Sequence, residues 1–114
     1  MSYVTKLDVI QNDYGYDLEF QLTDANGNAV DLSGVTSVQI FVAEKDATVA
    51  KVVGTCVIVP PATDGKFKYT VQEGDFDVGN KDYQVEVEIT YPAKVISGKG
   101  VIISVLPELP ETKG

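Results

Sequence analysis

Acidic side chains at alternating positions are the first residues whose types and spacing could do chemistry. Glu86 and Glu88 lie two positions apart, and Glu19 is a third carboxylate that a sheet could bring near them. Two carboxylates at a fixed separation can act as acid and base on a glycoside. Both residues of the pair, however, occupy polar positions of an alternating segment, where solvation keeps them ionised. We therefore expect no catalytic role for these carboxylates.

A calcium loop is a second possibility, suggested by the Asp-Ala-Asn-Gly-Asn motif at residues 24–28. Its oxygen-bearing side chains alternate as at the start of such a loop. The helix-loop-helix calcium site needs glycine at its sixth position and a bidentate carboxylate at its twelfth, where this chain has Ala29 and Val35. The motif instead favours a hairpin turn, and we expect no metal site.

Nucleophilic chemistry has little support in the residue types. Cys56 is the single cysteine and the chain contains no histidine, so neither an intrachain disulfide nor a histidine-based triad can form. Cys56 lies in an apolar stretch, which is typical of an inert core thiol. The glycines are dispersed as turn residues and form no phosphate-binding loop. The sequence thus predicts a protein that is not an enzyme and needs no cofactor.

Residues 109–112, Leu-Pro-Glu-Thr, resemble the sorting signal by which surface proteins of Gram-positive bacteria are attached to the cell wall. That signal continues with glycine, whereas Lys113 follows here. We interpret residues 107–114 as a proline-rich linker or tail, because two prolines interrupt regular pairing.

Charge narrows the choice of partners. Nine basic and seventeen acidic residues give a net charge of -8, which disfavours nucleic acid and anionic membrane surfaces. The amino terminus lacks the basic start and apolar run of a signal peptide, and no apolar stretch has the roughly 20 residues of a membrane span. Together with the single cysteine, this fits a protein that folds in a reducing cytoplasm.

The elements that must position these residues show a period of two, which is typical of half-buried strands. Residues 83–91 alternate most regularly, with tyrosine, valine and isoleucine on one face and glutamine, glutamate and threonine on the other. Three further strands are expected at residues 16–23, 35–44 and 67–72. Weaker patterns mark residues 4–10, 49–53, 55–59 and 101–106, and turn residues separate the segments, including Ser97-Gly98.

This pattern predicts an all-β fold at residues 1–106: an immunoglobulin-like, two-sheet antiparallel sandwich of seven to eight strands, with a barrel as the second choice. One helical turn at residues 73–76 is expected to bury Phe76. Tyr83 opens the most regular strand, where sandwiches often place a tyrosine whose hydroxyl fastens the preceding corner. Phe41 is expected to point outward from its strand.

An ordered set of motifs resembles a known family. Residues 17–24 are followed by the Val-Asp-Leu-Ser-Gly run at residues 30–34, and residues 63–71 and 82–89 continue the similarity. Together they resemble the amino-terminal immunoglobulin-like domain of baseplate upper proteins from phages of Gram-positive bacteria. The resemblance covers roughly residues 16–106, and this chain is shorter than the full proteins of that family.

The resemblance implies a structural protein of the phage tail or baseplate, located in the virion. Its partners would be other tail or baseplate proteins, with further copies of itself as another candidate. The alternative is a cell-surface adhesin or carbohydrate-binding module, suggested by the sorting-signal motif and by four aromatic residues able to stack on a sugar: Tyr3, Tyr14, Phe41 and Phe76.

Overall fold

The computed structural model describes residues 5–108 of the chain. Val4 of the first expected strand, Tyr3 and the Leu-Pro-Glu-Thr motif at residues 109–112 lie outside the described residues. Within residues 5–108 the chain is all-β, and its one helical element is a short 3-10 helix, Ala62–Asp64. No helix in this part of the chain is long and apolar enough to cross a membrane.

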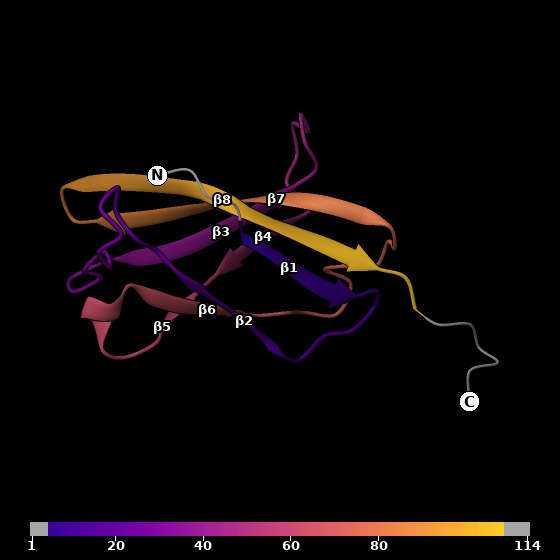
Figure 1. Cartoon of the computed structure of the whole chain (residues 1–114), viewed down its shortest axis with the longest axis horizontal. Coiled ribbons are helices and arrows are strands. Elements are labelled where there is room, and N and C mark those ends of the chain that lie inside the picture. Colours follow the sequence, from indigo (N-terminus) through magenta and orange to yellow (C-terminus); the bar gives the residue numbers. More distant parts are fainter. Residues whose placement is uncertain (1–4, 109–114) are drawn as a thin grey trace.

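The strands follow one another along the chain and form two facing sheets (Figure 1). Their bounds are β1 Thr5–Ile10, β2 Asp17–Gln21, β3 Ser37–Ala43, β4 Val52–Thr55, β5 Val57–Ile58, β6 Lys66–Thr70, β7 Lys81–Tyr91 and β8 Lys94–Leu106. The larger sheet has the order β1-β8-β7-β3-β4, and the smaller has the order β2-β6-β5. The all-β, two-sheet architecture expected from the period-two pattern is therefore confirmed.

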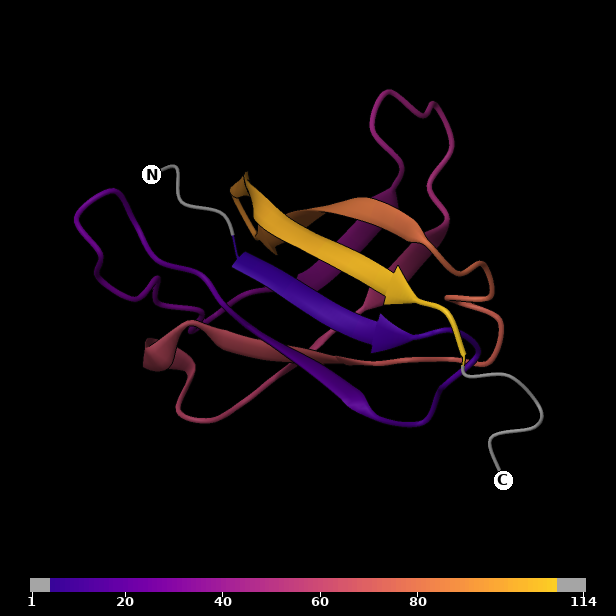
Figure 2. The ribbon, with the colours of Figure 1, turned by 45° about the vertical axis from the view of Figure 1, so that its right-hand side comes forward.

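One strand pair departs from the antiparallel arrangement. β1 runs parallel to β8, with Thr5 opposite Val101 and Ile10 opposite Leu106. The expectation of a wholly antiparallel sandwich was wrong, because alternation of side chains specifies faces and not strand direction. The two strands lie side by side in Figure 2, where both arrows point the same way.

β8 is also longer than expected. Ser97 and Gly98 were expected to interrupt the chain, yet they lie inside β8 and pair with Glu88 and Val87 of β7. The irregularity falls at Gly100, where the register with β7 shifts and φ is 124°. A bulge with a positive φ suits glycine, so the glycines here bend a strand and do not end it.

β4 and β5 form one extended segment that leaves the larger sheet and enters the smaller. The expected strands at residues 49–53 and 55–59 were separated at Gly54, but the transition lies at Cys56. Gly54 pairs with Ile40 inside β4, and glycine suits this position because a Cβ there would collide with the ring of Tyr69. Cys56 holds the crossing by donating its backbone N–H to the Val38 carbonyl over 2.8 Å.

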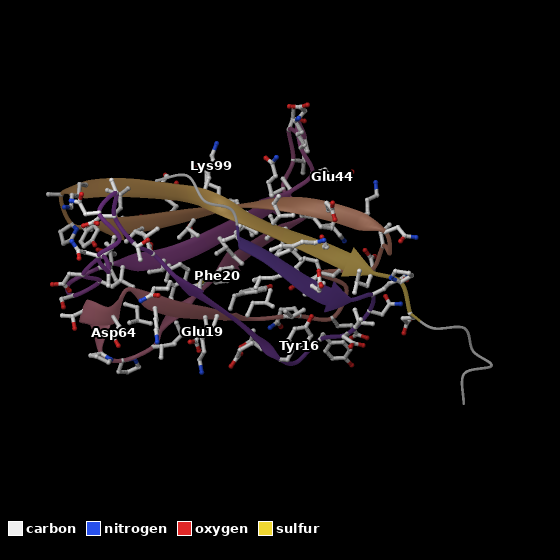
Figure 3. The ribbon with its side chains drawn as sticks, viewed as in Figure 1. Tyr16, Glu19, Phe20, Glu44, Asp64 and Lys99 are labelled. Atoms are coloured by element: carbon white, nitrogen blue, oxygen red, sulfur yellow. The ribbon has the colours of Figure 1, made fainter. Side chains whose placement is uncertain are left out.

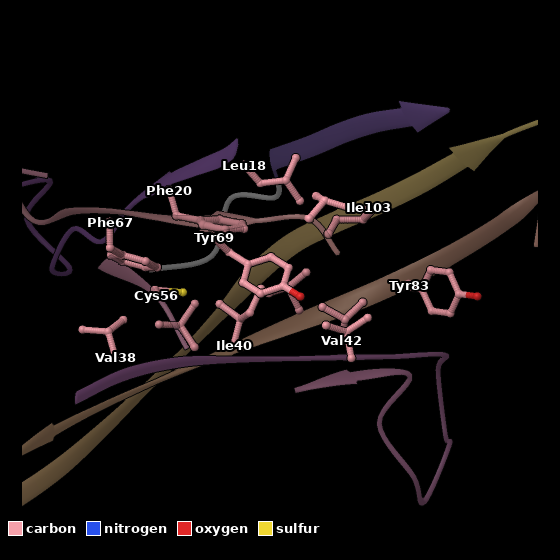
Figure 4. Packing of buried hydrophobic residues seen from close by; sticks show 14 of the residues in the cluster. Leu18, Phe20, Val38, Ile40, Val42, Cys56, Phe67, Tyr69, Tyr83 and Ile103 are labelled. Carbon is pink, nitrogen blue, oxygen red and sulfur yellow. The ribbon is translucent and has the colours of Figure 1, made fainter. Parts of the chain in front are cut away.

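The core fills the space between the sheets. Phe20 and Phe67 stack with ring centroids 5.5 Å apart, and Ile40, Ile89 and Ile103 are fully buried. Figure 4 shows Cys56 and the ring of Tyr69 among the valines and isoleucines of β3. Each fully buried aliphatic or aromatic side chain contributes about 1.5–3 kcal/mol, and this packing holds the sheets together.

The tyrosine hydroxyls that make hydrogen bonds are not the one that the sequence predicted. Within residues 5–108 the Tyr83 hydroxyl makes no hydrogen bond to the preceding corner; its ring packs against Phe76 instead. Residues 73–76 form a turn and no helix, although Phe76 is buried as expected. Tyr69 donates to the carboxylate of Asp75 over 2.5 Å, and Tyr91 donates to the Asp31 carbonyl over 2.7 Å.

Candidate functional site

Three exposed valines lie on or just before β4 and β5, strands that each have one edge which no described strand covers, and we call this region the apolar edge. Val49 precedes β4, Val53 lies in it and Val57 begins β5, with exposed fractions of 78%, 59% and 62%. β4 pairs only with β3, and β5 only with β6. An unpaired strand edge presents backbone donors and acceptors that can accept another strand.

The orientation of the β4 backbone follows from its pairing with β3. Cys56 donates to Val38, so the backbone groups of Cys56 point toward β3. Partners alternate along an antiparallel strand. The N–H and C=O groups of Val53 and Thr55 therefore point away from β3, toward the unpaired side.

A hollow of about 360 Å³ lies on the outward face of the larger sheet, and we call it the outer hollow. Phe41 and Ile102 supply its apolar surface. Phe41 therefore points outward from β3, as the sequence predicted. The loop between β3 and β4, which projects from this face in Figure 1, borders it with Glu44 and Asp46. Gln84, Glu86 and Lys99 add polar groups, so the hollow combines an aromatic ring with carboxylates, an amide and an amine.

Two ion pairs lie at the ends of the loop that connects β3 to β4. Lys81 lies 2.9 Å from Glu44, which raises the pKa of that lysine. Lys51, just before β4, lies 2.8 Å from Asp77, and this contact lowers the pKa of the Asp77 carboxyl. These pairs are solvated and stabilise the fold little, but they anchor both ends of the projecting loop.

A second hollow, of about 460 Å³, opens between the sheets beside the part of β8 that β1 does not cover. Its walls are mainly apolar and include Phe20, Leu22, Val30 and Ile96. Leu22 lies over Gly98, where an added Cβ would come within 2.9 Å of the leucine Cδ1. This hollow is the open side of the core, and Asp24 and Lys99 also line it.

The carboxylates considered for acid-base chemistry do not form one group. Glu86 and Glu88 lie on the outward face of the larger sheet, opposite Phe41 and Gln39 of β3. Glu19 belongs to β2 of the smaller sheet, where it faces Lys68. Figure 3 shows Glu19 on the opposite side of the molecule from Lys99, the residue that pairs with Glu86.

The calcium-like motif forms the expected turn. The carboxylate of Asp24 accepts hydrogen bonds from the N–H groups of Asn26 and Asn28, at 2.9 and 3.0 Å. The backbone N–H of Asp24 also donates a hydrogen bond to the Asn28 carbonyl over 2.8 Å. The oxygens of this motif thus serve the turn itself, and residues 5–108 contain no cluster of three or more acidic or cysteine side chains placed to hold a metal.

Cys56 is buried, and burial raises the pKa of its thiol to about 12. The thiolate that a nucleophile or a metal ligand requires is therefore almost absent at neutral pH. The structure places Cys56 in the core, as the apolar stretch indicated.

Sequence reasoning identified Phe41 but missed the apolar edge. Val53 and Val57 looked like core residues of weak strands, since their neighbours are also apolar. No signal in the sequence singles them out, because the uncharged run from Val52 to Thr63 is no longer than the run from Leu32 to Ala43, which contains the central strand β3. Comparison of the sequence with known protein families and with curated proteins finds no match.

Proposed function

We propose that this chain is a structural protein of a phage tail or baseplate. It acts through protein-protein contacts in the assembly and host-attachment apparatus and catalyses no reaction. It is made in the bacterial cytoplasm and incorporated into the virion beside other tail or baseplate proteins. The ordered resemblance over residues 16–106 supports this proposal.

The strand orders support an immunoglobulin-like fold as part of the proposal. In immunoglobulin domains, strands B, E and D share one sheet, and G, F and C share the other, which can be extended by C′. The order β2-β6-β5 corresponds to B-E-D, and β8-β7-β3-β4 corresponds to G-F-C-C′. Tyr83 then stands near the start of strand F, where such domains place a tyrosine.

The apolar edge is the observation on which the assembly role depends. Val53 and Val57 are exposed on strands that each have one unpaired edge, Val49 is exposed just before β4, and such surfaces can be sites of protein contact. An assembly protein buries them when it reaches its partner.

Purified virions test the proposal. Particles of a phage that encodes the chain would be labelled with gold-conjugated antibody against it and viewed by electron microscopy. We expect gold at the tail tip, with particles of an unrelated phage as the control. Unlabelled tails, in particles whose other baseplate proteins are detected by mass spectrometry, would contradict the proposal.

A carbohydrate-binding module is the second candidate, and the outer hollow favours it. Phe41 offers a ring face, and Gln84, Glu44 and Asp46 offer hydrogen-bonding groups. Sugar sites in proteins combine such a ring with a few polar groups.

A glycan array would separate the two functions. Binding of a defined sugar, lost in Phe41→Ala and retained in Tyr14→Ala, would support a sugar site, because Tyr14 is exposed but does not line the hollow. No binding at high protein concentration would remove this candidate and leave the structural role.

A further inference from the structure

The first half of β8 has one open strand edge. β1 pairs with residues 101–106 of β8, and among residues 5–108 no strand pairs with the same side of residues 94–100, which we call the β8 edge. In Figure 1, β8 extends well beyond the start of β1. Backbone groups along such an edge can bind another extended segment. A segment that continued β1 toward the amino terminus would therefore lie along the β8 edge.

The second hollow lies beside this edge. Its volume is about 460 Å³, and residues 96–100 of β8 form one of its walls. Phe20, Leu22 and Val30 supply apolar surface from β2 and the residues that follow it. An apolar hollow next to an open strand edge fits an added strand that directs a large apolar side chain inward.

The alternation of β1 identifies the side chain that would reach the hollow. Val9 is buried in the core, and Leu7 packs against it. Every second residue of a strand shares a face, so a continued β1 would direct Tyr3 to this inward face. The residue next to the hollow would thus be an aromatic one.

The bulge of β8 sets the place of this tyrosine along the strand. Thr5 lies opposite Val101, and the bulge at Gly100 adds one residue before the next inward position of β8, Gly98. Tyr3 therefore falls beside Gly98. A Cβ added at Gly98 would come within 2.9 Å of a side chain in the wall of the hollow. This position thus faces the hollow and has no side chain of its own to fill it.

We propose that residues 1–4 continue β1 along the β8 edge and that the side chain of Tyr3 fills the second hollow. Four extended residues span about 13 Å, which matches the length of residues 97–100 of β8. Burial of the ring removes apolar surface from water, and Asp24 and Lys99 of the hollow offer partners to the tyrosine hydroxyl.

The placement does not depend on the proposed function, because the segment and the hollow belong to the same chain. With residues 1–4 in place, this side of the sandwich offers neither an open strand edge nor an apolar hollow to another protein. Virion labelling tests the assembly role, whereas the purified chain tests the placement, so the two can fail separately.

Nuclear Overhauser spectroscopy of the full chain tests the placement without any substitution. We expect cross-peaks between the ring protons of Tyr3 and the methyl protons of Leu22 and Ile96, which line the hollow. Tyr14 is the control ring, since it is 55% exposed and does not line the hollow, and it should give no such cross-peaks. Absence of the Tyr3 cross-peaks in the folded chain would overturn the proposal.

Urea denaturation compares the two tyrosines. Tyr3→Ser should raise the equilibrium constant for unfolding at least about tenfold, because a buried ring becomes a small polar group. Tyr14→Ser is the matched control and should leave this constant nearly unchanged, since its ring is exposed. Equal effects of the two substitutions would overturn the burial of Tyr3.

Disulfide formation on the outward face tests the register. A continued β1 sets Val4 beside Lys99, and neighbouring strands lie about 4.8 Å apart, within reach of a disulfide. Val4→Cys with Lys99→Cys should form a disulfide within one chain under mild oxidation, whereas Val4→Cys with Val95→Cys, four residues farther along β8, should not. Cys56 is buried and does not compete. Equal yields in the two double variants, or no disulfide in either, would overturn the register, and disulfide-linked dimers alone would show that another copy supplies the strand and overturn the proposal.

Discussion

At the scale of single residues, Cys56 shows how burial removes a reactive group from use. Its thiol has a pKa raised to about 12 by burial, and the residue is 8% exposed. We expect a thiol reagent at about pH 8 to label the folded chain at least about a hundredfold more slowly than the unfolded chain. Labelling at the same rate with and without denaturant would contradict the buried position.

Two glycines should respond differently to alanine. At Gly54 the new methyl group meets the ring of Tyr69, which is held by its hydrogen bond to Asp75. At Gly98 it meets only the flexible end of Leu22. Denaturant unfolding should show Gly54→Ala destabilised by about 1–3 kcal/mol and Gly98→Ala by less than about 1 kcal/mol. Equal losses would be inconsistent with this packing.

The local sequence was enough to predict the burial of Cys56 and Phe76 and the place of Asp24 in a turn. Cys56 lies in an apolar stretch, Asp24 in a turn motif, and Phe76 among polar neighbours that isolate a buried ring. The hydrogen bond expected of Tyr83 was wrong, because its ring position is set by packing against Phe76, and local sequence does not specify that contact.

At the scale of elements, the alternating pattern predicts which face of a strand is buried. It predicted the central strands β3 and β7 well, since both are flanked by partners and alternate along their length. It did not predict the parallel pairing of β1 with β8 or the sheet change at Cys56. The direction of a strand and the sheet to which it belongs depend on the path of the connections between strands. A two-residue period specifies only the two faces of a strand and carries no information about that path.

Central and edge strands should differ in their contribution to stability. Ile89 of β7 is fully buried, so Ile89→Ala should lower the free energy of unfolding by about 2–5 kcal/mol. Val57→Ala on β5 should change it by less than about 0.5 kcal/mol in dilute solution, because the side chain is exposed. Urea denaturation measures both. A large loss for Val57→Ala would mean that this valine serves the fold and not a contact.

At the scale of the whole molecule, buried tyrosines link stability to alkaline pH. Burial raises the pKa of Tyr16, Tyr69, Tyr83 and Tyr91 above the ordinary value of 10.0. The unfolded chain therefore ionises first as the pH rises, and the stability present below about pH 10 is lost as the pH approaches the folded values.

Thermal unfolding should show this loss. We expect the melting temperature to be nearly constant between about pH 7 and 9 and to fall above about pH 10. Absorbance at the tyrosinate band should rise at higher pH in the folded chain than in denaturant. Coincident titrations in the two states would contradict the burial of these hydroxyls.

The apolar edge connects the whole molecule to its surroundings, and the amides of Val53 and Thr55 report on it most directly. Their N–H groups point to the unpaired side of β4, so hydrogen exchange at these two positions should be fast in the chain alone, whereas the N–H of Gly54, which points toward Ile40 of β3, should exchange slowly. Two-dimensional NMR of the chain in deuterated buffer follows all three amides. Exchange at Val53 and Thr55 as slow as that at Gly54 would contradict an open edge at β4, and with it the contact surface on which the assembly role depends.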